Sequence, residues 1–380
     1  MNKKQSIFAA SYLGVASVWL GGHFGPGFAT GVFSAQYYEK YGVIGLLMPL
    51  LAMLLTGGVM FYMVEFARSK GTTNYRSFVQ AAFGEDTFGK IMVVFYDILF
   101  VGTVIGAGGL AIRGEATILG NMFHMSFWAS AIPTIIVAAL LCLYGSKLVA
   151  RSSKYMMYAI VVIVLLIFIL SSASGKPDYA AAFAAPPIEQ NNTLLNAIWK
   201  AILYGCFQST IAFNVMSVSD LLESRAETRK AVVTGYIVTV ILMIAIAVTL
   251  FGYIPVNPDI INLGKNSNPI MAVIMGLGMP WLVWVFAILM TLAVLTSAAG
   301  IANAGCVRFS KLFSFIKNIQ LRRAVITAIL LGIAAFGASL GMGVLTQKVT
   351  GYIGYAGILG LVIPAFTIVR AKLKKDSDAK

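Results

Sequence analysis

The residues best able to do chemistry lie in a break of the first hydrophobic segment, residues 21–27 (GGHFGPG). Glycine costs backbone entropy in a helix, and proline removes an amide donor and clashes with the preceding turn. In hydrocarbon, non-helical backbone survives only where it lines a cavity or is buried in protein, and its carbonyls and amides can bind ions. The break therefore predicts a site for a polar solute, with substrate-binding residues Gly22, His23, Gly25 and Gly27.

His23 and Asp97 are ionisable residues that lie well inside hydrophobic segments, where a charge is expensive and is a candidate for function. His23 can contact substrate, carry a proton or hydrogen-bond a freed carbonyl. Asp97 can act as a proton relay, a cation ligand or a buried structural acid. Both are therefore candidates for proton coupling, and the alternatives stay open.

A polar interruption in a later hydrophobic segment, residues 204–210 (YGCFQST), corresponds in position to the first break when the halves of the chain are compared. Gln208, Ser209, Thr210 and Asn214 cluster there. Such side chains can hydrogen-bond neighbouring helices. Because they match the first break, we predict that they contact substrate.

Thr296 and Ser297 are adjacent hydroxyl residues surrounded by small side chains. Two such hydroxyls can present oxygens to a hard cation, and carbonyls of unwound backbone complete the coordination. The alternative is a small-residue packing face whose hydroxyls bond the preceding turn. Elsewhere, Arg113 and Glu115 are placed to form an external gate pair.

The composition indicates a polytopic membrane protein. Of the 380 residues, 59% are hydrophobic and 11% are charged, and the mean hydropathy is +0.86, too apolar for a soluble chain of this length. The start of the chain lacks a cleavage site and is read as a retained helix. The three cysteines fit neither a disulfide framework nor a zinc site. No enzyme motif is present, so we expect a non-enzyme without a cofactor.

Ten spans are predicted from runs of mostly apolar residues. Their ranges are 6–38, 41–66, 88–116, 126–146, 151–173, 193–222, 228–254, 279–310, 321–341 and 348–370. With both termini in the cytoplasm, the internal segments hold all 28 Lys and Arg residues except Lys40, Arg113, Lys176, Lys200, Lys265 and Lys348. The net charge of +14 therefore sets topology, and no nucleic-acid partner is expected.

The chain is predicted to contain two five-span repeats, 1–185 and 186–380, within one transport domain. Residues 98–107 (ILFVGTVIGA) and 288–297 (ILMTLAVLTS) are weakly similar. An odd number of spans in each half makes the second half inverted, and paired broken helices in inverted halves point to a transporter's binding site. The short apolar stretch 269–277 is predicted to be an interfacial or re-entrant helix over the external vestibule.

Two motifs resemble known families. The breaks in spans one and six and Leu295-Thr296-Ser297 in span eight resemble the amino acid–polyamine–organocation superfamily, which has the LeuT fold. Residues 25–31 (GPGFATG) are similar to the Gly-Ala-Gly-Phe-Ala-Ser-Gly signature of YkvI-like bacterial membrane proteins. The resemblance implies an all-α protein with ten transmembrane helices in a 5+5 inverted repeat and helices 1 and 6 discontinuous. It also implies a Na⁺ site of Thr296, Ser297 and the carbonyls of Ala293 and Leu20.

The sequence thus leads us to expect a cation-coupled secondary transporter of a small organic solute, with Na⁺/amino acid symport by alternating access as the specific form. Spans one, two, six and seven would rock against the rest. We expect a multi-pass protein of the bacterial cytoplasmic (inner) membrane, either a monomer or a weak homodimer. A proton-coupled carrier using His23 or Asp97 and a non-transporting nutrient sensor or receptor subunit are the alternatives.

Overall fold

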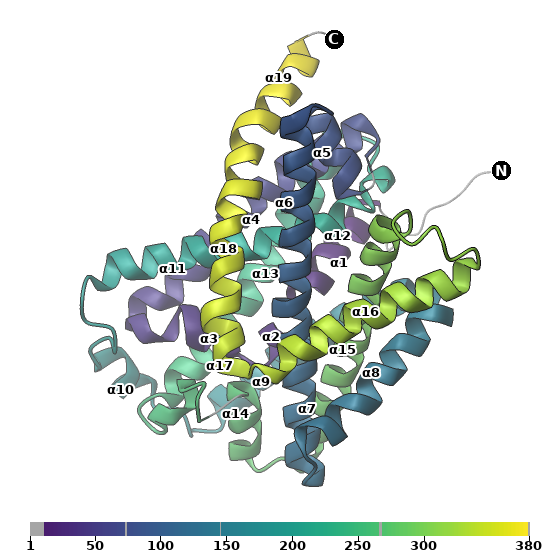
Figure 1. The fold of residues 1–380 in the computed structure, drawn as a ribbon. Coiled ribbons are helices and arrows are strands. Elements are labelled where there is room, and N and C mark those ends of the chain that lie inside the picture. The colour runs from purple at the N-terminus through teal and green to yellow at the C-terminus, as the bar shows by residue number, and fades with distance from the viewer. Residues whose placement is uncertain (1–10, 73, 145, 266–267, 379–380) are drawn as a thin grey trace, which may run out of the picture.

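The computed structural model describes residues 11–72, 74–144, 146–265 and 268–378, and these residues form helices and no strand (Figure 1). Within the described residues, six helices are long and apolar enough to cross a membrane. These are Val43–Lys70, Thr87–Phe123, Arg225–Tyr253, Pro280–Phe309, Ile319–Ser339 and Met342–Asp376. The described helices fall in all ten predicted ranges, whereas the count of ten crossings stays a prediction. Residues 6–10 of the first predicted span lie outside the described residues.

The first hydrophobic segment is broken as predicted. Helix α1 (Ser11–His23) ends before a turn at Phe24 and Gly25, and α2 (Pro26–Ala29) begins at Pro26. A second break precedes α3 (Val32–Tyr37), where Gly31 has φ +79°. An added Cβ at Gly31 would lie 2.9 Å from Ile270 Cγ1. Only glycine combines this left-handed conformation with so close an approach.

The sixth segment is interrupted less strongly than predicted. It consists of α11 (Thr193–Gln208), a 3₁₀ turn η4 (Ser209–Ile211) and α12 (Ala212–Met216). Backbone dihedrals stay in the right-handed helical region from Gln208 to Ala212. Ser209 Oγ donates to the Gly205 carbonyl and Thr210 Oγ1 donates to the Phe207 carbonyl, each at 2.8 Å. The hydroxyls therefore bond carbonyls of the preceding turn, and the segment changes its hydrogen-bond pattern without unwinding.

The helices form two groups, and the short elements α2, η4 and α12 of the interrupted segments contact the second group. In the first group, α1 and α11 pack on two long helices, α4 (Gly42–Lys70) and α13 (Arg225–Tyr253). The second group consists of α6 (Thr87–Thr103), the π-helical turn η3 (Val104–Gly108), α7 (Gly109–Phe123), α8 (Phe127–Tyr144), α15 (Pro280–Phe309) and α16 (Ile319–Ser339). Glycines allow close packing in the second group: a Cβ on Gly109 would lie 2.9 Å from the backbone of Gly337.

The remaining elements complete the bundle. They are α9 (Ser146–Ala173), α10 (Tyr179–Ala184) and a C-terminal run of α17 (Met342–Val344), η7 (Leu345–Val349), α18 (Thr350–Gly357), η8 (Ile358–Val362), η9 (Ala365–Val369) and α19 (Arg370–Asp378). Figure 1 shows α5 (Tyr75–Phe83) and α19 at one end and α10 and α14 (Pro269–Leu277) at the other. The sequence predicts that α5 and α19 are internal, and this orientation stays a prediction.

The short apolar stretch 269–277 forms a helix, α14, as predicted. The Asn268 side chain accepts a hydrogen bond from Met271 N at 3.0 Å and caps its first turn. Ile270 N donates to the Thr30 carbonyl at 3.0 Å. Helix α14 is thereby attached to the second break of the first segment.

Candidate functional site

A cavity of about 540 Å³ runs alongside the broken first segment. Its wall includes the α1 break and parts of α12 and α15, and it extends to Asn74, Tyr75 and Arg308 near α5. The end at α5 is the predicted internal end. On the opposite side, Tyr37 Oη and Thr350 Oγ1 share a hydrogen bond of 2.8 Å, which ties α3 to α18. The cavity thus extends to the predicted internal end, whereas this hydrogen bond lies at the predicted outer end.

The backbone of the break lies close to the predicted cation ligands. A Cβ added to Gly25 would lie 3.3 Å from Ser297 Oγ, and both Ser297 and Ala293 line the cavity. The Leu20 carbonyl accepts a hydrogen bond from Phe24 N at 2.8 Å, and Leu20 does not line the cavity. The side chain of Thr296 lies outside the described residues. The structure thus brings Ser297, Ala293 and the break together, while Leu20 lies within α1, one turn before its end at His23.

The break also meets the 3₁₀ turn of the sixth segment. A Cβ on Gly22 would lie 2.8 Å from Ile211 Cγ2 and 3.8 Å from Asn214 Nδ2. Among the predicted substrate residues, those lining the cavity are Gly22, His23, Gly25, Gly27, Gln208, Thr210 and Asn214. Ser209 is the exception and does not line the cavity. Its hydroxyl is bonded to the Gly205 carbonyl of its own helix. Gln208 Nε2 donates to Tyr204 Oη at 2.6 Å, which fixes the side chain.

His23 lies within a group of aromatic rings. Its imidazole is 2% exposed, and its ring centroid lies 5.2 Å from Phe24, 5.3 Å from Phe28 and 6.1 Å from Tyr204. Within the described residues, neither ring nitrogen has a hydrogen-bond partner. An unpaired buried polar group costs about 1–3 kcal/mol. A ligand or a conformational change that supplies a partner to His23 is favoured by that amount.

Asp97 is engaged by two partners at the α5 end of the cavity. Arg308 contacts both carboxylate oxygens, with Nε 2.6 Å from Oδ1 and Nη2 paired with Oδ2. Tyr75 Oη donates to Oδ1 at 2.7 Å. Arg308 and Tyr75 line the cavity, whereas Asp97 does not. Of the three roles left open by the sequence, a buried structural acid fits this bidentate geometry.

Arg113 and Glu115 do not form the expected gate pair. Thr291 Oγ1 donates to Glu115 Oε1 at 2.5 Å, and Glu115 is 1% exposed. The Arg113 guanidinium lies 4.6 Å from the centroid of the Phe127 ring. The expectation treated both side chains as exposed charges, but α7 turns Glu115 towards α15 and Arg113 towards α8. Glu115 thus bonds Thr291 and Arg113 lies over Phe127, while Glu115 Oε2 and Arg113 Nε have no hydrogen-bond partner within the described residues.

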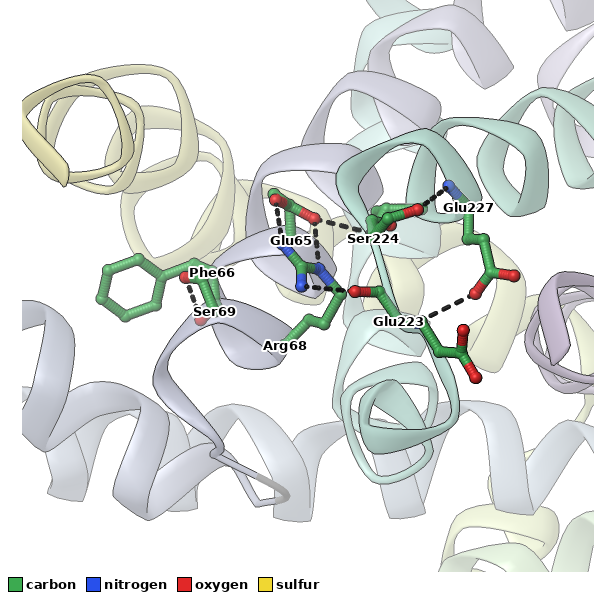
Figure 2. Close-up of polar contacts among 8 residues, drawn as sticks. Glu65, Phe66, Arg68, Ser69, Glu223, Ser224 and Glu227 are labelled. Atoms are coloured by element: carbon green, nitrogen blue, oxygen red, sulfur yellow. Dashed lines mark hydrogen bonds and ion pairs between the residues drawn. The ribbon is translucent and has the colours of Figure 1, made fainter. Parts of the chain in front are cut away.

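A polar network joins α4 and α13 (Figure 2). Arg68 Nη2 lies 2.7 Å from Glu65 Oε1, and Thr228 Oγ1 donates to Glu65 Oε2 at 2.7 Å. Ser224 caps the start of α13, where its Oγ accepts from Glu227 N at 3.2 Å, and the Glu227 side chain reaches back to accept from Glu223 N at 2.9 Å. The spacing of Ser224 and Glu227 would have revealed this cap from the sequence alone.

Several cavity residues have types that sequence reasoning passed over. These are Phe28, Phe33, Tyr75, Phe100, Phe207 and Arg308. Aromatic residues in apolar segments resemble ordinary core, and Arg308 resembles a topology-setting charge, so most of these residues carry no local signal. A signal existed only for Phe28 and Phe207, because each lies next to a predicted substrate residue.

Comparison with known proteins places the fold. No family model and no curated protein matches the chain. MhsT in complex with L-phenylalanine is 14% identical, with a TM-score of 0.68 over 95% of this chain and 98% of that chain. A Na⁺-coupled sialic acid symporter in a substrate-bound outward-open state is 15% identical, with a TM-score of 0.64 over 94% of this chain and 82% of that chain. A mutant of the Eremococcus coleocola manganese transporter is 15% identical, with a TM-score of 0.61 over 96% of this chain and 80% of that chain.

These similarities define the class of structure to which the chain belongs. It has the LeuT fold and is a polytopic membrane protein, as the sequence predicted. At 14–15% identity, the likeness concerns architecture. A shared fold does not determine which solute or ion is carried.

Proposed function

We propose that this protein is a cation-coupled secondary transporter of a small organic solute, with Na⁺/amino acid symport by alternating access as the specific form. The observation that carries the proposal is the position of the α1 break. Its backbone meets Ser297 of α15 at Gly25 and meets Ile211 and Asn214 of the sixth segment at Gly22, all beside one cavity. A cation and a solute bound there would contact both groups of helices.

The proposed Na⁺ site consists of Thr296, Ser297 and the carbonyls of Ala293 and Leu20. Hard cations take oxygen ligands, and hydroxyls with backbone carbonyls supply them without a net charge. The close approach of Gly25 to Ser297 supports this site. No further cofactor is proposed.

The proposed solute site lies between the α1 break and the polar residues of the sixth segment. A cavity of about 540 Å³ falls within the range of about 300–1,000 Å³ typical of small-molecule sites. The described lining residues include no Asp or Glu. A small neutral or zwitterionic solute fits such a wall, because its charges find partners in Na⁺ and in the backbone of the break.

A proton-coupled carrier is the second candidate, and the unpaired nitrogens of His23 favour it over one based on Asp97. The bidentate contact with Arg308 keeps Asp97 occupied. A nutrient sensor or receptor subunit with the same fold would bind its ligand without moving it.

The wider assignment follows from the same features. We propose inverted halves at 1–185 and 186–380, with α1, α4, α11 and α13 rocking against the second group. Interruptions at α1–α2 and at η4 support that division. We also propose that the chain is a member of the YkvI-like family and lies in the bacterial inner membrane with ten spans and cytoplasmic termini. It would act as a monomer or weak homodimer.

The test is the thermal stability of purified protein against a panel of amino acids, each in NaCl and in choline chloride. A ligand at 100 times its Kd stabilises the native state by about 2.7 kcal/mol. We expect one solute to raise the midpoint in Na⁺ only. Ser297→Ala should abolish that dependence, while Ser339→Ala, at the far end of α16, should retain it. Stabilisation that is equal in choline and changes only with pH would refute Na⁺ coupling and favour His23.

A further inference from the structure

Glu39 is a buried carboxyl without a cation partner on the predicted outer side. It lies in the 3₁₀ turn η2 (Glu39–Tyr41), between α3 and α4. Glu189 N donates to the Lys40 carbonyl at 2.9 Å, so η2 is attached to the segment between α10 and α11. Figure 1 shows α10 at the end of the bundle opposite α5. Glu39 therefore lies far from the internal mouth of the cavity.

The surroundings of Glu39 favour the neutral, protonated form of its carboxyl group. The side chain is 2% exposed, and Ser34 Oγ donates to Oε1 at 2.7 Å. Within the described residues, Oε2 has no hydrogen-bond partner and no ion pair involves Glu39. Burial raises the pKa of Glu39 to about 8, and the Ser34 hydrogen bond opposes that rise. A charged carboxylate in this position would be strongly disfavoured.

The titratable groups around η2 do not neutralise Glu39. The elements that pack against η2 are α3, α4, α11 and α13. Lys200 of α11 acts on Lys40, whose pKa is lowered by burial and by that neighbour. The Tyr204 ring of α11 packs against the rings of Tyr37 and Tyr38. Helix α4 has no titratable side chain before Tyr62. The other titratable groups are Tyr41 of η2 itself, Tyr253 near the end of α13, and Glu189, whose N donates to the Lys40 carbonyl, and none of them is a cation.

Glu39 is also placed where the outer side must open. Helix α3 carries Phe33, which lines the cavity, and Tyr37, which is bonded to Thr350. In alternating access, α3 has to leave α18 and α14 for solute to enter from outside. That movement breaks the Thr30–Ile270 and Tyr37–Thr350 contacts and brings water to the corner formed by η2.

We infer that Glu39 is a proton-linked gating residue: it stays neutral while the outer side is closed and releases its proton to the external water when that side opens. This inference rests on the proposed alternating access. Closing takes the proton back from the same solution, so external pH shifts the equilibrium between the two forms without net proton transport.

The direction of the pH effect follows from the two environments. In the closed form the pKa of Glu39 is raised to about 8, and in the open, hydrated form it returns towards its ordinary value of 4.5. Below that ordinary value the carboxyl is neutral in both forms and favours neither. Between the two values, opening releases a proton, and its equilibrium constant rises by up to about tenfold per pH unit. Above about pH 8 both forms are ionised and the dependence ends.

The test measures opening directly by labelling Ile270→Cys, a buried α14 position against Gly31, in a chain whose native cysteines are replaced. A membrane-impermeant maleimide is applied from outside between pH 5.5 and 9. Each rate is divided by the rate of the same cysteine in a Glu39→Gln chain, which cancels the pH dependence of the thiol. We expect a ratio that rises at least tenfold across this range and then levels off. A flat ratio would overturn the inference.

Ser34→Ala provides a control on the native carboxyl, and it remains informative where Glu39→Gln does not fold. The Ser34 hydrogen bond lowers the pKa of Glu39, so its loss should raise that pKa. The midpoint of the pH dependence of labelling should then move to higher pH, while the size of the change in labelling rate stays the same. A midpoint that does not move contradicts the gating role. Labelling that is pH-dependent to the same degree with and without Glu39 leaves the transport proposal intact, whereas no labelling in any chain at any pH contradicts both.

Discussion

Asp97→Asn tests whether the acid inside the third segment holds the fold together or carries a proton. The change removes the charge that faces Arg308 while it keeps the size of the side chain. Loss of one partner of a buried ion pair costs about 3–5 kcal/mol, and loss of an exposed pair about 0–1 kcal/mol. The Arg308 and Asp97 side chains are 13% and 24% exposed. An intermediate cost of about 2–3 kcal/mol is therefore expected.

The diagnostic measurement is the double variant Asp97→Asn/Arg308→Gln. If the pair is structural, removing both charges leaves no uncompensated cation, so the thermal midpoint and the uptake of the stabilising solute into proteoliposomes recover together. Arg308→Gln alone should be damaging, because it leaves the carboxylate with Tyr75 only. A double variant that is as stable as the native protein but as inactive as Asp97→Asn would refute this reasoning, because the carboxyl itself would then be required for transport.

Three further changes test the packing around the cavity and between the helices. Gly25→Ala places a Cβ 3.3 Å from Ser297 Oγ, so it should weaken the Na⁺-dependent thermal shift, whereas Gly21→Ala, with nothing within 4 Å, should not. Thr228→Val removes the hydroxyl bonded to Glu65 and should lower stability by about 1–3 kcal/mol; an unchanged midpoint would mean that the network of Figure 2 is dispensable. Gly109→Ala should destabilise by about 1–3 kcal/mol through overpacking against Gly337, and an equal effect from Gly332→Ala, which has open space, would contradict this cause.

The first break was predictable because its signal is local. Glycine and proline act on the backbone of the residues that carry them, so residues 21–27 predict the end of α1 without knowledge of any neighbour. The sixth segment lacks proline, and its hydroxyls can bond the preceding turn. Ser209 and Thr210 do so. For this reason the polar residues, from which we predicted an unwound helix, form a 3₁₀ turn.

Partners that lie far apart in sequence were beyond local reasoning. Asp97 and Arg308 are separated by 211 residues, and Glu115 and Thr291 by 176. Nothing in either segment specifies which side chain of the other it will face. Glu39 shows the same difficulty: an acid between two spans reads as an exposed loop residue, and its burial arises only when α4, α11 and α13 pack around η2.

The polar contacts at the predicted internal end fall into two sets, each of which joins helices of one group. Glu65, Arg68 and Thr228 connect α4 with α13, both in the first group. Asp97 and Arg308 connect α6 with α15, both in the second. In the proposed rocking motion these two networks stay intact and keep each group rigid.

The contacts that cross between the groups are of a different kind. Gly25 against Ser297 is a close approach of backbone to hydroxyl without a hydrogen bond. The Lys70–Asp376 pair joins α4 to α19, which belongs to neither group, and its side chains are 36% and 41% accessible. Exposed pairs contribute about 0–1 kcal/mol, so neither contact holds the groups in one arrangement. A cation bound between Gly25 and Ser297 would attract oxygen atoms from both groups and hold the α1 break against α15. In the proposed cycle, its binding is therefore what makes one arrangement of the two groups more stable than the other.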